Sequence, residues 1–495
     1  MLPRQEAGLR NYERNGIDKM KKINLKYMVV TAVSAAFILT GCGQGMGKMV
    51  TDPVNSIVSG TALASGALSS EETSVYTDSR DGGHAITADG IEAQYKNASV
   101  TKTGDSEGDE ADFYGENSAV YATNGAKLAL SGMEITTDGT HANAVFSYGE
   151  GTEVEISNST IETSGNCSGG IMTTGGGTMK ASDLNIHTTG RSSAAIRSDR
   201  GGGTVTVNGG SYTTEGVGSP AIYSTADITV NDAVLTSKAS QGVVVEGKNS
   251  VSLNNTVLNA DNNTHNSDKS DRFQAVMIYQ SMSGDADEGL ARFSANGGSI
   301  VNSNGDIFFV NNTATDISLT GVDIENKGDG VFLYAAKAGW GNEGSNGGKV
   351  NLTASNQKID GDMIVDDISV LNLYLKDGSE FTGAVNPDGA AGDVYVELKN
   401  GSKWVLSGNS NITSLTCDED SIDLNGYTLT VNGETYTQGK RSSGTAIEIK
   451  SEGGGKTGGM PAPPDGERQA PPDGKGQPPQ GKGTPLSRKP EKPIP

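Results

Sequence analysis

The chain has 495 residues and a formal net charge of −22, and its composition is 34% hydrophobic and only 5% aromatic, with 69 glycines. The acidity argues against a nucleic-acid partner, which selects a basic surface, and we interpret it chiefly as a source of solubility. So few large apolar residues argue against one spherical core of this size, but they suit a thin core with many turns.

The first predicted element is a secretory signal peptide, residues 20–41. Lysines follow Met20 and precede an apolar run from Tyr27 to Leu39, which is the pattern of a signal peptide. An uncleaved membrane anchor is the alternative, but the run is shorter than the roughly 20 residues that a bilayer span needs. Residues 1–19 lack a targeting pattern and are interpreted as an upstream extension.

The signal peptide closes on Leu39, Thr40, Gly41 and Cys42, which resembles the bacterial lipobox. The resemblance implies cleavage before Cys42 and lipidation of its thiol and new amino group. The protein would then sit on the extracellular face of the bacterial cell envelope, touching the membrane through the lipid only. Residues 42–84, rich in Ser, Gly, Thr and Ala, are predicted to form a flexible tether.

From Ser118 to Leu352 the sequence repeats with a period of about 25 residues. One column of the repeat contains only Gly, Asn and Asp, the residues that adopt the left-handed α conformation at low cost. A short polar residue precedes each of them, which predicts a ladder of stacked polar side chains beside a recurring bend. The column comprises Gly132, Asn158, Asp183, Gly209, Asp232, Asn255, Gly297 and Gly321.

Apolar columns surround the bend. Residues four and two positions before it and three positions after it are apolar in every unit, so strands with a period of two run into and out of the bend. A third strand per unit centres on β-branched residues, which are Val120, Val145, Ile171, Ile196, Ile222, Val243, Val276, Ile307 and Val331. Because no single unit can bury its apolar face alone, the pattern predicts an all-β fold, a single-stranded parallel β-helix with three short strands per coil. We extend the crossover rule by analogy and predict that it is right-handed.

The β-helix is predicted to cover residues 85–450. Beyond Leu352 the spacing shortens to 23 residues, with Leu375–Phe381 echoed by Leu398–Trp404, which indicates further coils of a different cross-section. Asn432 and Gly433 have the sequence of a hairpin turn. Residues 451–495 are rich in Pro, Gly and Lys and are predicted to be disordered.

A candidate binding surface lies on the third strand of each unit. The residue after each β-branched position is expected to point outward, and an exposed apolar stripe of this kind marks a binding surface. Rings spaced at one coil, about 4.8 Å, suit stacking against sugar rings. The alternatives are that the two faces are reversed or that neighbouring loops cover the stripe. The column reads Tyr121, Phe146, Met172, Arg197, Tyr223, Val244, Met277, Phe308 and Phe332.

Three insertions are predicted to wall a groove over this stripe. They contribute His265, Tyr279 and Trp340 as candidate groove residues. The insertions are Asn259–Arg272, Tyr279–Gly289 and Ala336–Gly348.

The second insertion also holds a candidate Ca²⁺ site. Asp285, Asp287 and Glu288 lie close together in sequence, and Ca²⁺ takes carboxylate oxygen ligands. The stretch matches no EF-hand spacing, so a solvated turn is the simpler interpretation. No other cofactor is predicted.

No catalytic constellation is recognisable in the sequence. The four histidines are scattered, and the stripe offers Arg197 alone, with Asp199 and Arg200 just beyond it. Cys167 and Cys417 are too far apart along the solenoid to pair, and neither has a histidine at metal-ligand spacing, so both are expected to be free thiols. The protein is therefore predicted not to be an enzyme.

Several segments resemble a group of adhesin-like bacterial surface β-helix proteins found in anaerobic gut bacteria. They are Val120–Ala126, Tyr279–Asp287 and Gly344–Leu352, and the likeness spans Ser118 to Asp423, while Gly401–Thr416 is similar to autotransporter passenger coils. The resemblance implies a surface-exposed solenoid and transfers no catalytic residue. We expect adhesion through binding of polysaccharide, on host or cell-wall glycans; the alternatives are a passive stalk or surface-coat protein and a polysaccharide lyase or hydrolase.

Overall fold

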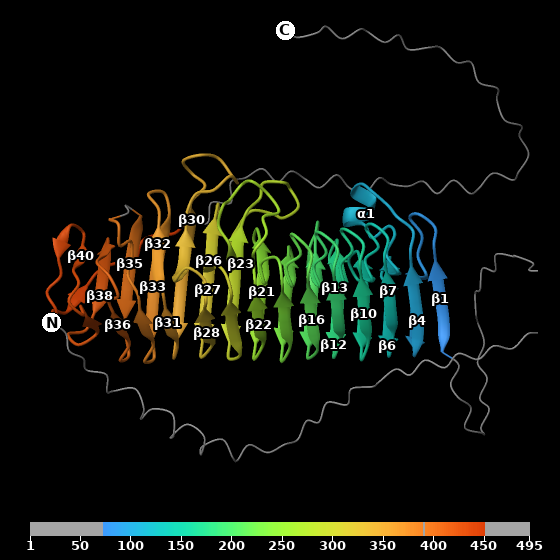
Figure 1. Ribbon diagram of the computed structural model, residues 1–495, viewed down its shortest axis with the longest axis horizontal. Helices are drawn as coiled ribbons and strands as arrows, with labels where there is room; N and C mark the ends of the chain where they lie inside the picture. The colour runs from blue at the N-terminus through green and yellow to red at the C-terminus, as the bar shows by residue number, and fades with distance from the viewer. Residues whose placement is uncertain (1–72, 390–391, 451–495) are drawn as a thin grey trace, which may run out of the picture. The chain divides into compact units, whose positions relative to one another are not determined.

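The computed structural model describes residues 73–389 and 392–450. They contain one short helix, α1 (Asp109–Phe113), and strands that assemble into three long sheets. Successive coils lie beside one another along the stack, so the fold is a parallel β-helix, as predicted (Figure 1). The predicted signal peptide, Cys42, the N-terminal extension and the C-terminal tail lie outside the described residues. Within the described ranges, no helix combines the length and the apolar character needed to cross a membrane.

Each regular coil contributes one strand to each long sheet in turn, and neighbours within a sheet are one coil apart. Sheet A consists of β1 (Ser74–Asp78), β4 (Ala98–Lys102), β7 (Glu134–Thr137), β10 (Thr160–Thr163), β13 (Asn185–Thr188), β16 (Ser211–Thr214), β19 (Val234–Ser237), β22 (Val257–Ala260), β25 (Ser299–Asn302) and β28 (Asp323–Asn326). Sheet B consists of β2 (Ile86–Asp89), β5 (Val120–Thr123), β8 (Val145–Tyr148), β11 (Ile171–Thr174), β14 (Ile196–Ser198), β17 (Ile222–Ser224), β20 (Val243–Glu246), β23 (Gln274–Tyr279), β26 (Asp306–Asn311), β29 (Val331–Ala335) and β32 (Asp362–Val365).

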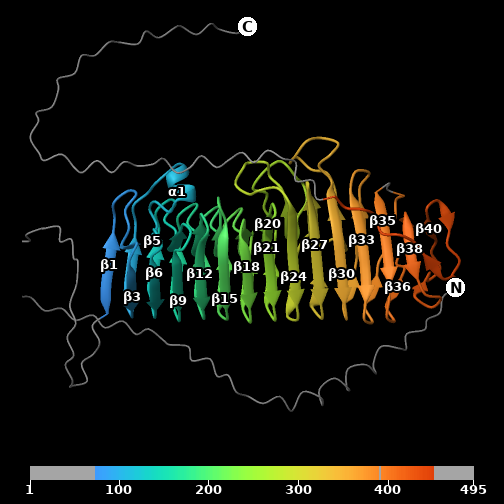
Figure 2. The ribbon, with the colours of Figure 1, turned by 180° about the vertical axis from the view of Figure 1, so that it is seen from behind.

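Sheet C runs furthest along the stack, and its strands lie side by side in the view from behind (Figure 2). It consists of β3 (Glu92–Lys96), β6 (Lys127–Ser131), β9 (Glu153–Ser157), β12 (Gly177–Ser182), β15 (Gly203–Asn208), β18 (Asp227–Asn231), β21 (Ser250–Asn254), β24 (Leu290–Asn296), β27 (Thr313–Thr320), β30 (Gly348–Ser355), β33 (Val370–Lys376), β35 (Asp393–Leu398), β38 (Ser414–Cys417) and β42 (Ser442–Ser443). Two small sheets complete the C-terminal end, one of β31 (Lys358–Asp360), β34 (Glu380–Thr382), β36 (Lys403–Val405) and β39 (Ile422–Asp423), the other of β37 (Ser410–Ile412), β40 (Leu429–Val431) and β41 (Glu434–Thr435).

The recurring bend between sheets C and A is confirmed. All eight predicted bend residues have φ between 48° and 69°, in the left-handed region, where Gly, Asn and Asp are tolerated best. The predicted polar ladder runs beside them: Asn231 Nδ2 donates to Asn208 Oδ1, and Asn254 Nδ2 donates to Asn231 Oδ1, each at 2.9 Å. The ladder ties neighbouring corners together, coil to coil.

The predicted apolar columns form the core. Ile228 pairs in register with Val205 of the preceding coil and Val251 of the next, and each of these side chains is at most 1% exposed. The buried apolar residues make one continuous cluster along the solenoid. Full burial of a Val, Leu or Ile side chain contributes roughly 1.5–3 kcal/mol, so each coil is stabilised mainly by its two neighbours.

The change of cross-section after Leu352 is also confirmed. Sheet B ends at β32, and the sheet beginning with β31 runs beside the remaining coils. Phe381 pairs in register with Trp404, and their rings stack at 5.5 Å, as the echo of the two segments predicts. The predicted hairpin joins β40 to β41 in antiparallel pairing, with Asn432 and Gly433 at positive φ.

The predicted start of the β-helix at Ala85 is wrong. Strand β1, inside the predicted tether, pairs in register with β4 and belongs to sheet A. Only Asp78 of its five residues is buried. A terminal strand has one neighbour instead of two, so β1 lacks the apolar alternation by which the other strands are recognised in the sequence.

Candidate functional site

The outward-facing column of sheet B exists as predicted over most of its length. Tyr121, Phe146, Met172, Arg197, Tyr223, Val244 and Met277 pair with one another in register from coil to coil. Because strand residues alternate between faces, one column of neighbours in register points to one side of the sheet.

Phe308 and Phe332 do not belong to this column. Met277 pairs with Phe309, and Phe309 pairs with Tyr334. Phe308 and Phe332 are fully buried in the core, where their rings meet edge to face at 5.5 Å. The prediction that they face outward is wrong because a shift of one residue moves a strand's side chains to the opposite face. Phe309 and Tyr334 take their places.

The first coils of the column are covered. The segment around α1 lies over them, and Gly115 sits so close that a Cβ there would come within 2.6 Å of Tyr121 and 2.9 Å of Phe146. His84 stacks on the Tyr121 ring at 4.6 Å, and Phe146 and Met172 are fully buried. Burial raises the pKa of Tyr121 to about 12. Tyr121 and Phe146 are therefore packing residues beneath a lid, and the prediction that they form an exposed stripe is wrong.

A groove opens further along the same column. It has a volume of about 240 Å³ and brings together Tyr223, Met277, His265, Tyr279 and Trp340, all singled out in the sequence. The loops that border it rise from the same side of the stack as α1 (Figure 1). The remaining lining residues are mostly polar: Gly218, Pro220, Gln241, Val244, Asn262, Thr264, Asn266, Ser267, Lys269, Ser270, Arg272 and Gln274.

The apolar part of the groove is an aromatic cluster on the outer face of sheet B. Val244, Met277 and Phe309 are buried at its base, and Tyr223, Tyr279, Tyr334 and Trp340 pack partly buried against them. The rings of Tyr279 and Trp340 meet edge to face at 5.2 Å. Trp340 comes from the Ala336–Gly348 loop and the other members from strands, so rigid elements hold most of the rings.

One buried carboxylate fixes the two groove tyrosines. The Tyr223 hydroxyl donates to Glu246 Oε2, and the Tyr279 hydroxyl donates to the same oxygen at 3.1 Å. The Ser281 hydroxyl donates to the other oxygen, Oε1. Burial, and then the nearby negative charge, hold the pKa values of both tyrosines well above their usual range. The two hydroxyls are therefore neutral, and Glu246 orients both rings, which line the groove.

Positive charge lies along the wall of the groove. The Arg272 guanidinium stacks on the Tyr334 ring at 3.7 Å and donates from Nε to Asp306 Oδ2 at 2.6 Å. Lys269 Nζ lies 6.0 Å from the centre of the Trp340 ring. The exposed His265 ring stacks on Phe273 at 4.1 Å. These contacts place cations and an imidazole beside the aromatic cluster.

The buried Asp306 carboxyl gives a testable pH dependence. Burial raises its pKa to about 6, with Arg272 opposing this and Asp329 adding to it. A carboxyl whose pKa is raised on folding stabilises the fold most below its unfolded pKa, about 3.8, and loses that contribution as the pH rises through about 6. We expect the unfolding free energy to fall over this range in denaturant titrations, and to fall less in Asp306→Asn. An equal slope in the two proteins would contradict the assignment.

The predicted Ca²⁺ site is not formed. Asp285 Oδ1 pairs with Arg200 Nε at 2.9 Å, and Asp287 Oδ2 pairs with Lys248 Nζ at 2.7 Å. Glu288 lines a separate hollow. Each carboxylate is directed to a different place, whereas Ca²⁺ requires several oxygens converging on one point.

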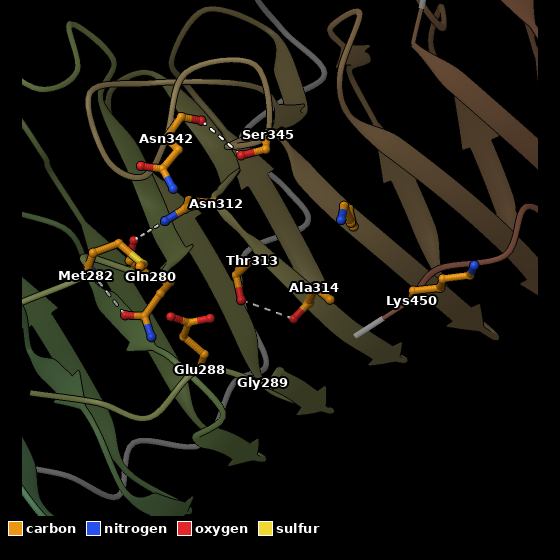
Figure 3. A pocket seen from close by; sticks show the side chains of 12 residues that line it. Gln280, Met282, Glu288, Gly289, Asn312, Thr313, Ala314, Asn342, Ser345 and Lys450 are labelled. Carbon is orange, nitrogen blue, oxygen red and sulfur yellow. Dashed lines mark hydrogen bonds between the residues drawn. The ribbon is translucent and has the colours of Figure 1, made fainter. Parts of the chain in front are cut away.

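That separate hollow lies between the Tyr279–Gly289 and Ala336–Gly348 loops and has a volume of about 260 Å³ (Figure 3). Gln280, Met282 and Glu288 approach from the first loop, and Asn312 Nδ2 closes it by donating to the Gln280 carbonyl oxygen at 2.8 Å. No aromatic side chain lines it within the part of the chain that the structure describes. The Tyr279–Gly289 loop therefore contributes Tyr279 to the groove and Gln280, Met282, Glu288 and Gly289 to this second hollow.

Sequence reasoning missed one group of side chains entirely. Cys167 is free, as predicted, but its sulfur lies with a nitrogen of His141 and a carboxylate oxygen of Asp112, all within 4.8 Å of one another. The sequence shows no histidine at metal-ligand spacing from Cys167, but the fold brings His141 to it. The sequence contained a signal of this proximity. His141 stands four residues before Val145, and Cys167 stands four residues before Ile171, the equivalent inward-pointing residue of the next coil.

Comparison of the chain with protein-family models, with curated proteins and with solved structures gives no match.

Proposed function

We propose that the protein is a lipid-anchored protein of the bacterial cell surface that binds a polysaccharide in the groove on sheet B and so mediates adhesion. The observation that carries the proposal is the pairing of an aromatic cluster, centred on Tyr279 and Trp340, with a rim of amide and hydroxyl side chains. The surface location rests on the lipobox-like sequence that ends at Cys42.

The chemistry of the groove matches that of a sugar chain. A sugar ring has apolar C–H faces, which pack on aromatic rings, and a belt of hydroxyls that both donate and accept hydrogen bonds. Gln241, Asn262 and Asn266 offer amide donors and acceptors around the rings. Ligand binding loses little conformational entropy in the rings of Tyr223 and Tyr279, because Glu246 already fixes their orientation.

The cations on the wall refine the class of ligand. Lys269 and Arg272 line the groove, but Arg272 is paired with Asp306, so Lys269 supplies most of the positive charge of the lining. No Asp or Glu is among the lining residues in the described chain. A polysaccharide bearing carboxylate or sulfate groups suits this wall better than a neutral one. The same lining lacks the pair of carboxylates on which most glycoside hydrolases rely, which favours binding over hydrolysis.

Trp340→Ala is the sharpest test of the groove. With the full chain on an array of polysaccharides, we expect binding to an acidic glycan that weakens at least tenfold when Trp340 is truncated, because the stacking surface is lost. Tyr427→Ala is a matched control, since Tyr427 is an exposed aromatic residue, 42% accessible, in the C-terminal part of the chain.

The other outcomes separate the alternative functions. Binding that both variants retain would place the ligand elsewhere on the solenoid. No ligand for the wild-type protein would favour a passive stalk or surface-coat protein. Shortened polymer products would favour a lyase or hydrolase over an adhesin.

A further inference from the structure

We propose that Asp112, His141 and Cys167 form a binding site for a zinc-type transition-metal ion. Their ligand atoms, a carboxylate oxygen, a ring nitrogen and a thiol sulfur, all lie within 4.8 Å of one another. Around a tetrahedral Zn²⁺ with bonds of about 2.0–2.3 Å, ligand atoms lie about 3.3–3.8 Å apart. Small side-chain rotations therefore suffice to close the three residues around an ion.

The solenoid itself places two of the ligands. His141 and Cys167 occupy the same corner of successive coils, between sheets A and B, and both have left-handed backbone conformations, with φ of 56° and 55°. The His141 N–H donates to the Asn166 carbonyl oxygen at 2.9 Å, and the Cys167 N–H donates to the Arg191 carbonyl oxygen at 2.8 Å. Because the two residues have the same backbone conformation and the same hydrogen bond to the next coil, their side chains point from the corner in the same direction.

The third ligand comes from α1, which is held in place from several sides. Thr174 Oγ1 donates to the Phe113 carbonyl oxygen at 2.6 Å, and the Arg200 guanidinium stacks on the Phe113 ring at 3.7 Å. Arg200 also donates from Nη1 to Asp109 Oδ2 at 3.1 Å. These contacts fix the helix that brings Asp112 over the corner.

A buried imidazole lies at the centre of the group. His141 is 7% exposed, and its Nδ1 lies 3.0 Å from Asp112 Oδ1. This contact pairs the ring with the carboxylate but lacks hydrogen-bond geometry. A metal ion bound by both atoms would take the place of this contact.

The donor set selects the class of ion. Thiolate, imidazole and carboxylate together suit Zn²⁺ and similar borderline ions, whereas Ca²⁺ and Mg²⁺ take oxygen ligands. Three protein ligands leave a fourth tetrahedral position open, and Cys167 and Asp112 are both partly exposed, so water can reach it. The nearby Arg197 is neutralised by Asp199, at 3.0 Å.

Cobalt binding tests the proposal directly, because a cobalt–thiolate bond absorbs in the near ultraviolet. The full chain, stripped of metals with a chelator, is expected to bind one equivalent of Co²⁺ with this absorption and to release it when Zn²⁺ is added. Cys167→Ser is expected to abolish the absorption, and Asp112→Asn to weaken binding at least tenfold. Ser192 occupies the same corner of the next coil with φ of 53°, so serine is compatible with the backbone of this corner.

Matched variants separate this site from other thiols and histidines. Cys417→Ser and His187→Ala are expected to bind Co²⁺ as the wild type does, since His187 lies on β13 outside both sites. Cobalt–thiolate absorption that survives in Cys167→Ser, or its absence from the wild-type protein, would overturn the proposal. Glycan binding is measured on the same samples, so failure of the metal site and failure of the groove are distinguishable.

Discussion

Phe308→Ala is expected to lower the local unfolding free energy by about 3–5 kcal/mol, the usual cost of truncating a buried phenylalanine, without weakening ligand binding. The Phe308 ring is fully buried and meets Phe293 and Phe332 edge to face, each at 5.5 Å. Its removal leaves a cavity between coils and removes both ring contacts. The groove lies on the other face of sheet B, so its lining is unchanged.

Phe309→Ala is the matched control for this prediction, since the same side chain is removed one residue further along. Phe309 is 1% exposed and packs beneath the groove against Tyr334, at 6.2 Å between ring centres, so its loss is expected to weaken glycan binding as well as stability. Long repeat arrays need not unfold in one step, and hydrogen exchange of β23, β26 and β29 reports the local free energy. If Phe308→Ala abolished binding while exchange stayed unchanged, the assignment of faces would be wrong.

The bends and the core columns could be predicted because every repeat unit carries the same residue types at equivalent positions. A single Gly, Asn or Asp does not identify a backbone conformation. When only these three residue types occupy one position of eight units, the left-handed conformation is the one they share, and all eight residues adopt it. The apolar columns are equally redundant. Strand pairing between neighbouring coils then follows, since equivalent residues must stack.

The assignment of faces failed where insertions interrupt the repeat. Residues 307–310 are Ile, Phe, Phe and Val, so alternation cannot say which of them points inward. The preceding coils are lengthened by loops, and the periodicity no longer fixes the register. Phe308 pairs with Val276, one residue away from the position that regular spacing suggests.

The contacts made by α1 could not be predicted from the repeat at all. The helix lies in a segment without periodicity, and its contacts with Thr174 and Arg200 join residues far apart in the sequence. Two of the three proposed metal ligands could nevertheless be found in the sequence, because His141 and Cys167 share one position of successive units. Asp112 required the structure.

Asp199→Asn is expected to destabilise the middle coils by about 3–5 kcal/mol, because it leaves a buried cation without its partner. Arg197 Nη2 lies 3.0 Å from Asp199 Oδ2, and the side chains are 13% and 6% exposed. Burial raises the pKa of Asp199 to about 6, and the Arg197 guanidinium beside it opposes this rise by favouring the carboxylate. Within the described residues, Arg197 Nη1 already lacks a hydrogen-bond partner. The guanidinium therefore has few other contacts to offset the loss of the Asp199 carboxylate.

A double replacement distinguishes the free energy lost by leaving one buried charge unpaired from the stability that the ion pair itself contributes. In Arg197→Met with Asp199→Leu, neither charge remains, and we expect most of the lost stability to return. Glu325→Gln is the surface control: Glu325 pairs with Lys327 at 3.3 Å, both side chains are more than half exposed, and a change below about 1 kcal/mol is expected. Hydrogen exchange of β14 and β17 measures the single and double variants at this pair, and exchange of β28 measures Glu325→Gln. Equal losses in the single and double variants would show that packing, and not the buried cation, sets the cost.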